Sequence, residues 1–201
     1  MTLRGTFATT ALALPLAFAT AVSATSPSAP RSPAPATYGI DTVHSSALFR
    51  IQHFGAGFFH GRFDEISGTV AFDEANPAAC SVDVTIKADS VDTKEPKRDT
   101  HLKGPDFFNA AEFPTLTFKS KSVKAAGKGE YEVTGDLTIH GVTKTLTVKV
   151  AHTGTGKGQS GEVVGFETVF TIKRSDFGMK FMHPQLGDEV RVTLALEAGK
   201  K

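Results

Sequence analysis

The sequence predicts an all-β domain of about eight antiparallel strands, and three observations support this fold class. After residue 38, apolar and polar residues alternate with a period of two along most of the chain, which is typical of strands with one buried face. Tight turn signals that contain Gly, Asn or Pro separate these segments. No segment has the apolar periodicity of a helix long enough to cover a sheet. Such a chain closes into a barrel or packs as a sandwich, and periodicity alone does not distinguish the two.

The composition limits the kinds of protein that this chain can be. It has 201 residues, with 22 Lys and Arg against 21 Asp and Glu, and its formal net charge is +1. No basic segment suggests a nucleic-acid partner. Cys80 is the only cysteine in the sequence, which rules out an internal disulfide framework. Stability must therefore come from a hydrophobic core. The content of 16 Phe against two Tyr and no Trp predicts an interior with few hydrogen-bonding groups.

The first 24 residues have the features of a secretory signal peptide. Arg4 precedes an apolar run over residues 7–22, and Val22-Ser23-Ala24 supplies the small residues of a cleavage site. An N-terminal membrane anchor is the alternative, but the run is short and is interrupted by Pro15. We therefore expect cleavage after residue 24 and a periplasmic or secreted protein.

The rest of the chain divides into a linker and one folded domain. Residues 25–37 are rich in Pro, Ala and Ser, and this composition predicts a disordered linker. The folded domain is expected over 38–198.

The strands are expected in the following order along the domain. Residues 47–52 form the first clear strand, and residues 59–73 form a long one whose glycines are expected to cause bends or bulges. Residues 81–88 alternate most clearly, with Val84 on the apolar face and Asp83 on the polar face, which indicates one buried and one solvent-exposed side. The remaining strands are expected over 115–123, 131–139, 143–150, 166–172 and 190–196, with a flexible loop over 154–161.

Residues 90–114 interrupt this alternation and form an irregular insert. Thr93 is a candidate N-cap for a short helix that accepts Pro96 in its first turn, and Gly104-Pro105 can end that helix. An insert of this kind suits a plug or lid on a β-structure, and function concentrates on such segments. Its polar residues are followed by a bulky apolar cluster: Arg98, Asp99 and His101, then Leu102, Phe107, Phe108 and Phe113.

Several short motifs occur in order over residues 38–197. They are Tyr38-Gly-Ile-Asp41 with His44-Ser45, Phe49-Arg-Ile-Gln-His53, Gly61-Arg-Phe63, Arg98-Asp99-x-His101-Leu102, Phe107-Phe108, Phe113-Pro114, Gly135-Asp-Leu-Thr-Ile-His-Gly-Val-Thr-Lys144, Arg174-Ser-Asp-Phe-Gly178 and Gly187-Asp-Glu-Val190. As an ordered set they resemble the YceI-like family of bacterial periplasmic, polyisoprenoid-binding, lipocalin-like proteins. The resemblance implies an extended eight-stranded antiparallel barrel with a short helical segment. It also implies a long apolar cavity that holds an isoprenoid chain, such as a polyprenyl lipid or a quinone.

The candidate ligand-binding residues are the inward-facing apolar side chains of the strands and the insert. A polyprenyl tail offers no hydrogen bonds, so its affinity rests on buried area, at about 0.8 kcal/mol per CH₂ before ordering costs. The expected cavity residues are Phe49, Ile51, Phe63, Phe72, Val84, Ile86, Leu102, Phe107, Phe108, Phe113, Leu116, Phe118, Leu137, Ile139, Phe170, Val192 and Leu194.

Two polar groups are expected near the ends of the strands. Arg98, Asp99 and His101 either contact a ligand head group at the cavity mouth or tie the insert to the barrel rim. Arg174 and Asp176 are predicted to be a second pair that fixes a loop.

Neither catalysis nor metal binding has a recognisable motif. The sequence lacks a nucleophile elbow, a P-loop and a dinucleotide fingerprint. The histidines His44, His53 and His60 do not have the spacing of a zinc site, and Cys80 has no second cysteine. The sequence therefore predicts a non-enzymatic protein without metal or cofactor.

The predicted function is to sequester or carry an isoprenoid lipid or quinone. No nucleic acid is expected as a partner, and the protein is not expected to be an integral membrane protein. A transient membrane contact and a homodimer are both compatible with the sequence. Two alternatives remain open at this point. One is an enzyme acting on a prenyl lipid, with Arg98, Asp99 and His101 as its polar centre. The other is a non-catalytic stress or redox accessory protein with a filled barrel.

Overall fold

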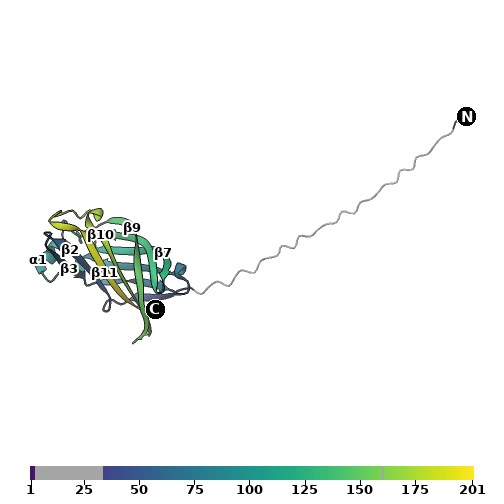
Figure 1. Ribbon diagram of the computed structural model, residues 1–201, viewed down its shortest axis with the longest axis horizontal. Coiled ribbons are helices and arrows are strands. Elements are labelled where there is room, and N and C mark those ends of the chain that lie inside the picture. The colour runs from purple at the N-terminus through teal and green to yellow at the C-terminus, as the bar shows by residue number, and fades with distance from the viewer. Residues whose placement is uncertain (3–33, 160) are drawn as a thin grey trace. The chain divides into compact units, whose positions relative to one another are not determined.

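The strands form a closed antiparallel barrel in the computed structural model, which describes residues 1–2, 34–159 and 161–201 (Figure 1). The barrel closes because β1 (Ala36–Ile40) pairs on one side with β4 (Ile66–Phe72) and on the other with β11 (Leu186–Lys200). The ring therefore has eight antiparallel strands, and the predicted barrel is confirmed. The strands between β4 and β11 are β5 (Ser81–Lys87), β7 (Thr115–Gly127), β8 (Glu130–Ile139), β9 (Val142–Gly158) and β10 (Gly161–Lys173).

Shorter strands extend this ring at one end. β2 (Ser46–His53) continues β1 along the same edge of β11. β3 (Gly57–Phe63) pairs with β2 and leads into β4, and β6 (Val91–Asp92) pairs with β3. The prediction of a single strand over residues 59–73 is therefore wrong, because the structure has two strands there, β3 and β4. The segment is interrupted because the main-chain N–H groups of Asp64 and Glu65 donate to the carbonyl and the hydroxyl of Ser90 instead of to a neighbouring strand.

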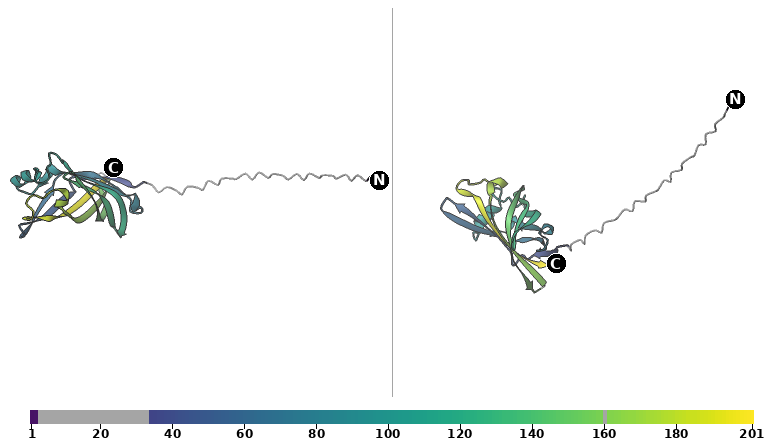
Figure 2. Two further views of the ribbon diagram at one scale, coloured as in Figure 1. Left: turned by 90° about the horizontal axis from the view of Figure 1, so that it is seen from above. Right: turned by 45° about the vertical axis from the view of Figure 1, so that its right-hand side comes forward.

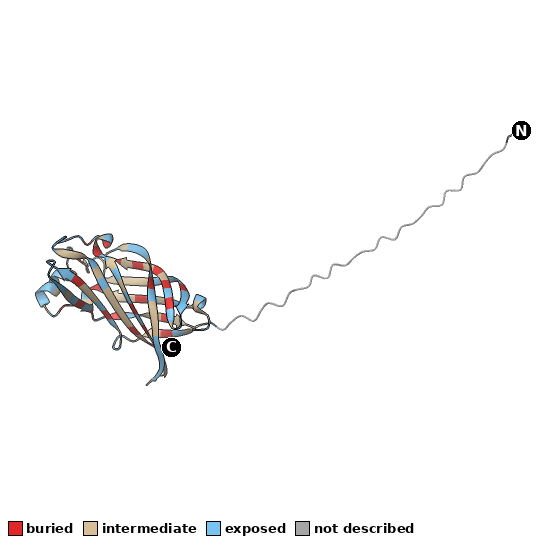
Figure 3. Cartoon of the chain, in the orientation of Figure 1, coloured by how far each residue is buried: buried red, intermediate tan, exposed pale blue. Residues whose placement is uncertain are grey.

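The predicted faces of the strands are confirmed. On β5, Val84 is buried and Asp83 is exposed. On β8, every second residue from Tyr131 to Ile139 is buried. Figure 3 shows buried positions spaced in this way along several strands. The predicted alternation therefore gives the correct register, because a shift of one residue would have exchanged the two faces.

The flexible loop predicted over residues 154–161 is instead part of two strands. β9 continues to Gly158 and β10 begins at Gly161, and Lys157 pairs with Glu162. The hairpin that they form lies near the C-terminus in Figures 1 and 2. Gly and Lys lack the apolar alternation that identifies a half-buried strand, so this extension had no signal in the sequence.

The insert contains one α-helix, α1 (Pro96–Lys103), at the end of the barrel opposite the C-terminus (Figure 1). Its N-cap is Glu95, whose carboxylate accepts hydrogen bonds from the N–H groups of Lys97 and Arg98, so the prediction of Thr93 as the cap is wrong. Gly104 ends the helix as predicted. The part of the chain that the structure describes also contains three short 3₁₀ helices: η1 (Pro77–Ala79), η2 (Ala88–Ser90) and η3 (Arg174–Phe177).

The end of the barrel away from α1 is filled by aromatic side chains. Phe72 ends β4 and packs edge-on against Tyr131 and Phe166, with ring centroids 5.8 and 5.1 Å away. The ring of His152 lies 4.8 Å from that of Phe72. Phe72, Tyr131 and Phe166 also line the barrel interior at this end.

Several predictions about the N-terminal region concern residues that the structure does not describe. The predicted signal peptide and most of the predicted linker fall there, although residues 36–37 of the linker belong to β1. Within the described part of the chain, we find no helix with the length and apolar character needed to cross a membrane.

Candidate ligand-binding cavity

The barrel interior contains two adjoining chambers. The inner chamber, of about 160 Å³, is walled by the strands. The outer chamber, of about 700 Å³, lies between β2, β3, the insert and the segment 179–186. The larger volume is typical of a small-molecule site, and the smaller one resembles apolar cavities that remain free of water. The chambers adjoin because they share lining residues: Phe49, Phe63, Leu116, Ile139, Ile172 and Val192.

The inner chamber is lined mainly by aliphatic and aromatic side chains. Val84, Val133 and Val148 are buried in its wall. The hydroxyl of Thr168, a polar member of this wall, already donates to the carbonyl of Lys149 at 2.7 Å. An occupant of this chamber would find apolar contacts and little to hydrogen-bond, as a hydrocarbon requires.

A group of phenylalanines lies where the two chambers meet. The ring of Phe63 is 5.7 Å from that of Phe49 and 5.3 Å from that of Phe108, measured between centroids. Gly61 lies opposite Phe49 on the neighbouring strand, and a Cβ atom there would collide with the Phe49 ring. The glycine therefore leaves the space that this ring occupies at the junction.

The outer chamber has a polar wall that is supplied by α1. Arg98 lines it, donates from Nε to the hydroxyl of Thr93 and from Nη2 to the Thr93 carbonyl, both at 2.8 Å, and lies 4.2 Å from the ring of Phe59. Asp99 accepts hydrogen bonds from the N–H and the hydroxyl of Thr93. These hydrogen bonds hold the insert in place. Asp99 itself does not belong to the residues that line either chamber.

His101 also lines the outer chamber, but it does not interact with Asp99 as an acid–base pair would. Its Nε2 lies 2.9 Å from a carboxylate oxygen of Asp106. Its ring packs edge-on against Phe107 and Phe181, at centroid distances of 5.0 and 5.3 Å. These contacts join α1 to the segment 179–186.

Arg174 is a wall residue of the outer chamber that the cavity prediction missed. It is only 3% exposed, and it donates hydrogen bonds of 2.8 to 3.0 Å to four main-chain carbonyls. Burial lowers the pKa of Arg174, and the nearby carboxylate of Asp188 opposes this effect. The guanidinium therefore fixes the segment that forms one side of the cavity. The four acceptors are the carbonyls of Met179, Phe181, Leu186 and Gly187.

The predicted pairing of Arg174 with Asp176 is wrong. Asp176 is exposed, whereas Asp188 accepts hydrogen bonds from the N–H and the hydroxyl of Ser175 at 2.9 and 2.8 Å. The arginine is held by carbonyls that lie five to thirteen residues away along the chain. Because every residue has a main-chain carbonyl, the sequence does not show which carbonyls will accept these hydrogen bonds.

The structure places sixteen of the seventeen predicted cavity residues in the walls of the chambers. The exception is Phe113, which packs against His140, with ring centroids 4.8 Å apart, and against Gly141. It follows a turn in which its N–H donates to the carbonyl of Asn109, and this turn carries it onto the β8–β9 connection. The prediction also missed several wall residues, which include Phe54, Phe58, Phe59, Phe166, Met179 and Met182.

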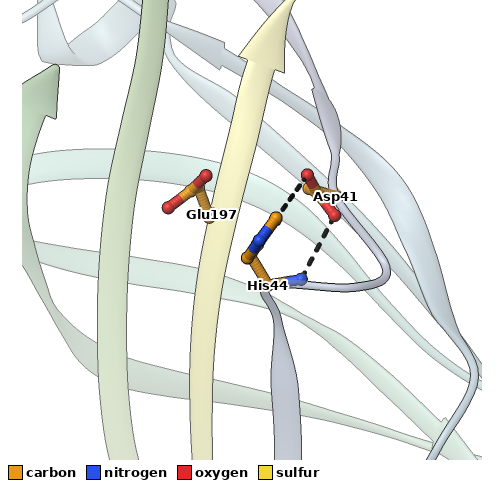
Figure 4. Close-up of side chains that lie close together, drawn as sticks. All are labelled: Asp41, His44 and Glu197. Atoms are coloured by element: carbon orange, nitrogen blue, oxygen red, sulfur yellow. Dashed lines mark hydrogen bonds and ion pairs between the residues drawn. The ribbon is translucent and has the colours of Figure 1, made fainter. Parts of the chain in front are cut away.

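A separate cluster of possible metal ligands lies outside the barrel interior. Asp41, His44 and Glu197 each offer one ligand atom, and these atoms lie within 4.8 Å of one another (Figure 4). The Asp41 carboxylate already accepts from the N–H groups of Val43 and His44 and lies 2.9 Å from Nδ1 of His44. Its hydrogen bond to that ring raises the pKa of His44. The cluster therefore stabilises the connection between β1 and β2. The sequence did not predict it because Glu197 comes from the last strand.

Fold and cavity together define the class of protein: an extended lipocalin-like barrel whose apolar interior reaches the surface at one end. The chain belongs to the YceI-like family, whose domain model matches residues 38–198. It is 43% identical over 165 residues to Protein YceI of Escherichia coli O157:H7, and the match covers 81% of this chain and 86% of that protein.

Solved structures share the same fold. BcnA of Burkholderia cenocepacia is 31% identical, with a TM-score of 0.73, and the match covers 79% of this chain and 99% of that structure. A polyisoprenoid binding domain from Saccharophagus degradans is 17% identical, with a TM-score of 0.63, over 83% of this chain and 99% of that domain. At this lower identity the likeness concerns the fold alone.

Proposed function

We propose that this protein is an exported, non-catalytic binding protein that sequesters or carries a long-chain isoprenoid lipid, such as a polyprenyl lipid or an isoprenoid quinone. The observation that supports this proposal best is the pair of adjoining chambers, which are apolar inside and polar only near the mouth. A ligand with a long hydrocarbon tail and a small polar head matches this distribution. The fold is also shared with a domain described as polyisoprenoid binding.

The tail would occupy the inner chamber and the junction, and the head group would lie in the outer chamber. Methyl-branched isoprenoid units would gain about 0.8 kcal/mol for each buried CH₂. A phosphate or a quinone oxygen would lie near Arg98 and His101, the polar members of the α1 wall. Arg98 would then combine two roles, because it also holds the insert through Thr93.

A displacement titration tests this proposal. Because the chain has no Trp, the reporter is an added fluorescent lipid that is displaced by unlabelled competitors. We expect a polyprenyl phosphate and a headless isoprenoid hydrocarbon to displace the reporter at micromolar concentrations or below, with one ligand bound per barrel. A palmitate control should compete at least about tenfold less well, because a short unbranched chain buries less surface. Failure of both isoprenoids to compete would contradict the proposal.

The enzymatic alternative predicts a different result. If the chain acted on prenyl lipids, the pair of His101 and Asp106 would be the group to transfer a proton. Incubation with a polyprenyl phosphate, followed by mass spectrometry of the lipid, distinguishes the two functions. We expect the lipid to be recovered unchanged, and a His101-dependent product would establish the enzyme instead.

Export is part of the proposal and rests on the sequence. The apolar run over residues 7–22 and the small residues Val22-Ser23-Ala24 support cleavage after residue 24. Protein recovered from the periplasm or the medium should have the mass of a chain that begins at Thr25. An intact chain in the membrane fraction would contradict export.

A further inference from the structure

Large apolar side chains are exposed around the opening of the outer chamber. Phe54 and Phe58 are 59% and 57% exposed, and Phe181 and Met182 are 40% and 38% exposed. We call these four residues the mouth rim. Single exposed apolar residues are ordinary, but a group of them at one place usually marks an interaction surface.

The mouth rim is one surface, although its residues come from separate segments. The N–H of Phe54 donates to the carbonyl of Gln185 at 2.7 Å, which joins the β2–β3 turn to the segment 179–186. The ring of Phe181 lies 5.3 Å from that of His101, which joins this segment to α1. Phe54, Phe58 and Met182 also line the outer chamber. The rim and the cavity opening are therefore continuous.

Cationic side chains accompany the rim. Lys97 and Lys103 belong to α1, and Lys180 precedes Phe181. Among the described residues, no carboxylate lies within ion-pair distance of these three lysines.

The carboxylates nearby in the sequence are already engaged. Glu95 caps the helix, Asp99 accepts from Thr93, and Asp106 lies 2.9 Å from Nε2 of His101. Hydrogen bonds from neutral donors leave these three carboxylates charged. Over residues 95–106 and 179–186, the four cations Lys97, Arg98, Lys103 and Lys180 exceed the three carboxylates by one, so the segments beside the rim have a small net positive charge.

We propose that the mouth rim docks on an anionic lipid bilayer, with the opening of the outer chamber facing the membrane. Aromatic and thioether side chains would enter the interfacial region, and the three lysines would meet lipid phosphates, a combination that anchors peripheral proteins. A second copy of the chain fits less well, because two rims that face each other would place like charges together. The inference extends the proposed function, since an isoprenoid that leaves the barrel at this end would pass directly into a bilayer.

Vesicle flotation without added isoprenoid tests the docking separately from ligand binding. Vesicles of phosphatidylcholine with about 30% phosphatidylglycerol should bind the protein, and phosphatidylcholine alone should bind it more weakly. The variant Phe54→Ser/Phe58→Ser should bind the anionic vesicles about tenfold less well. The control Val43→Ser/Val169→Ser removes apolar residues that are 84% and 39% exposed and lie outside the lining of both chambers, and it should bind like the wild type. Melting temperatures will establish that both variants are folded.

A charge variant distinguishes failure of the docking from failure of the proposed function. Lys97→Gln/Lys103→Gln/Lys180→Gln should reduce binding to anionic vesicles about tenfold. It should leave isoprenoid displacement unchanged, because these lysines lie outside the described lining of both chambers. Three results would each overturn the docking proposal: no vesicle binding by the wild type, equal losses in the rim and control variants, or a rim that instead forms a lipid-independent dimer.

Discussion

The inner and outer chambers are built by different kinds of segment. Regular strands supply the walls of the inner chamber, and their inward residues alternate with outward ones, as Val84 does with Asp83. The outer chamber is closed by α1, the β2–β3 turn and the segment 179–186, which meet through side chains such as His101 and Arg174. Under the proposed function, the strand scaffold would hold the hydrocarbon tail, and the inserted segments would select the polar group at the opening.

Because the two chambers are built differently, we expect substitutions in the inner chamber to affect stability and substitutions in the outer chamber to affect ligand binding. A charge in the inner chamber would lie among mainly apolar side chains, and the Thr168 hydroxyl in its wall is already hydrogen-bonded, so changes there should act on folding. The outer chamber reaches the surface and already contains charged groups, so changes there should act mainly on ligand binding. Four experiments test this division, from the largest expected effect to the smallest.

The largest effect is expected from a charge placed in the inner chamber. Val84→Asp and Leu137→Asp each bury a carboxylate beside apolar side chains and should lower the free energy of unfolding by about 3 kcal/mol or more. Asp83→Ala, one residue away on the exposed face, should change it by less than about 0.5 kcal/mol. Urea unfolding followed by circular dichroism measures all three. Similar losses for Val84→Asp and Asp83→Ala would contradict the assigned register.

Arg174 should be the exception to the division, because it is a buried part of the outer wall. Arg174→Met removes the donors to four carbonyls and should cost about 2–3 kcal/mol of stability. The exposed neighbour Asp176 provides the control, and Asp176→Ala should be nearly neutral. Hydrogen exchange should show the increased opening of Arg174→Met in residues 179–187. Uniform opening of the whole barrel would show that the arginine does not act locally.

Phe108 should contribute to binding of the ligand tail. Its ring packs against Phe63 where the chambers meet, and Phe108→Ala should lower the affinity for isoprenoids about tenfold or more. The loss should be the same for a polyprenyl phosphate and for a headless hydrocarbon, because both have the tail. Phe113→Ala is the matched control, since Phe113 packs outside the chambers against His140. A loss confined to the phosphate ligand would place Phe108 at the head group.

The smallest effect is expected from Arg98, which is exposed at the mouth. Arg98→Ala should weaken binding of a polyprenyl phosphate by about tenfold or less and should leave a headless isoprenoid unchanged, because only the phosphate accepts charge-assisted hydrogen bonds. Thr93→Val removes the hydroxyl partner of Arg98 but keeps the cation, and it therefore reports on the fixing of the insert alone. Equal effects of the two variants on both ligands would mean that Arg98 is only structural.

The sequence predicted the strand-built part of the molecule more completely than the mouth. Alternation identified inward residues such as Val192 and Leu194 because a strand repeats every two residues, and the structure places both in the inner chamber. The resemblance to a known family supplied the closure of the barrel, which alternation leaves open.

The mouth depends on contacts between segments that are distant in sequence. The local sequence predicts Thr93 as the cap of α1, but in the structure Thr93 is engaged by Arg98 and Asp99. The predicted partner of Arg174, Asp176, is wrong because the acceptors of Arg174 are main-chain carbonyls. Such contacts form only when the barrel brings the segments together, so local sequence patterns do not encode them.

Organic extraction of the purified protein, followed by mass spectrometry of the extract, tests most directly whether the barrel holds an isoprenoid. The protein should be purified from a bacterial periplasm without detergent, with a periplasmic protein that lacks an apolar cavity as the control. We expect a lipid whose fragments differ by isoprene units, at close to one molecule per barrel and absent from the control. An extract without lipid, or one that contains only straight-chain fatty acids, would contradict the proposal that this barrel is an isoprenoid carrier.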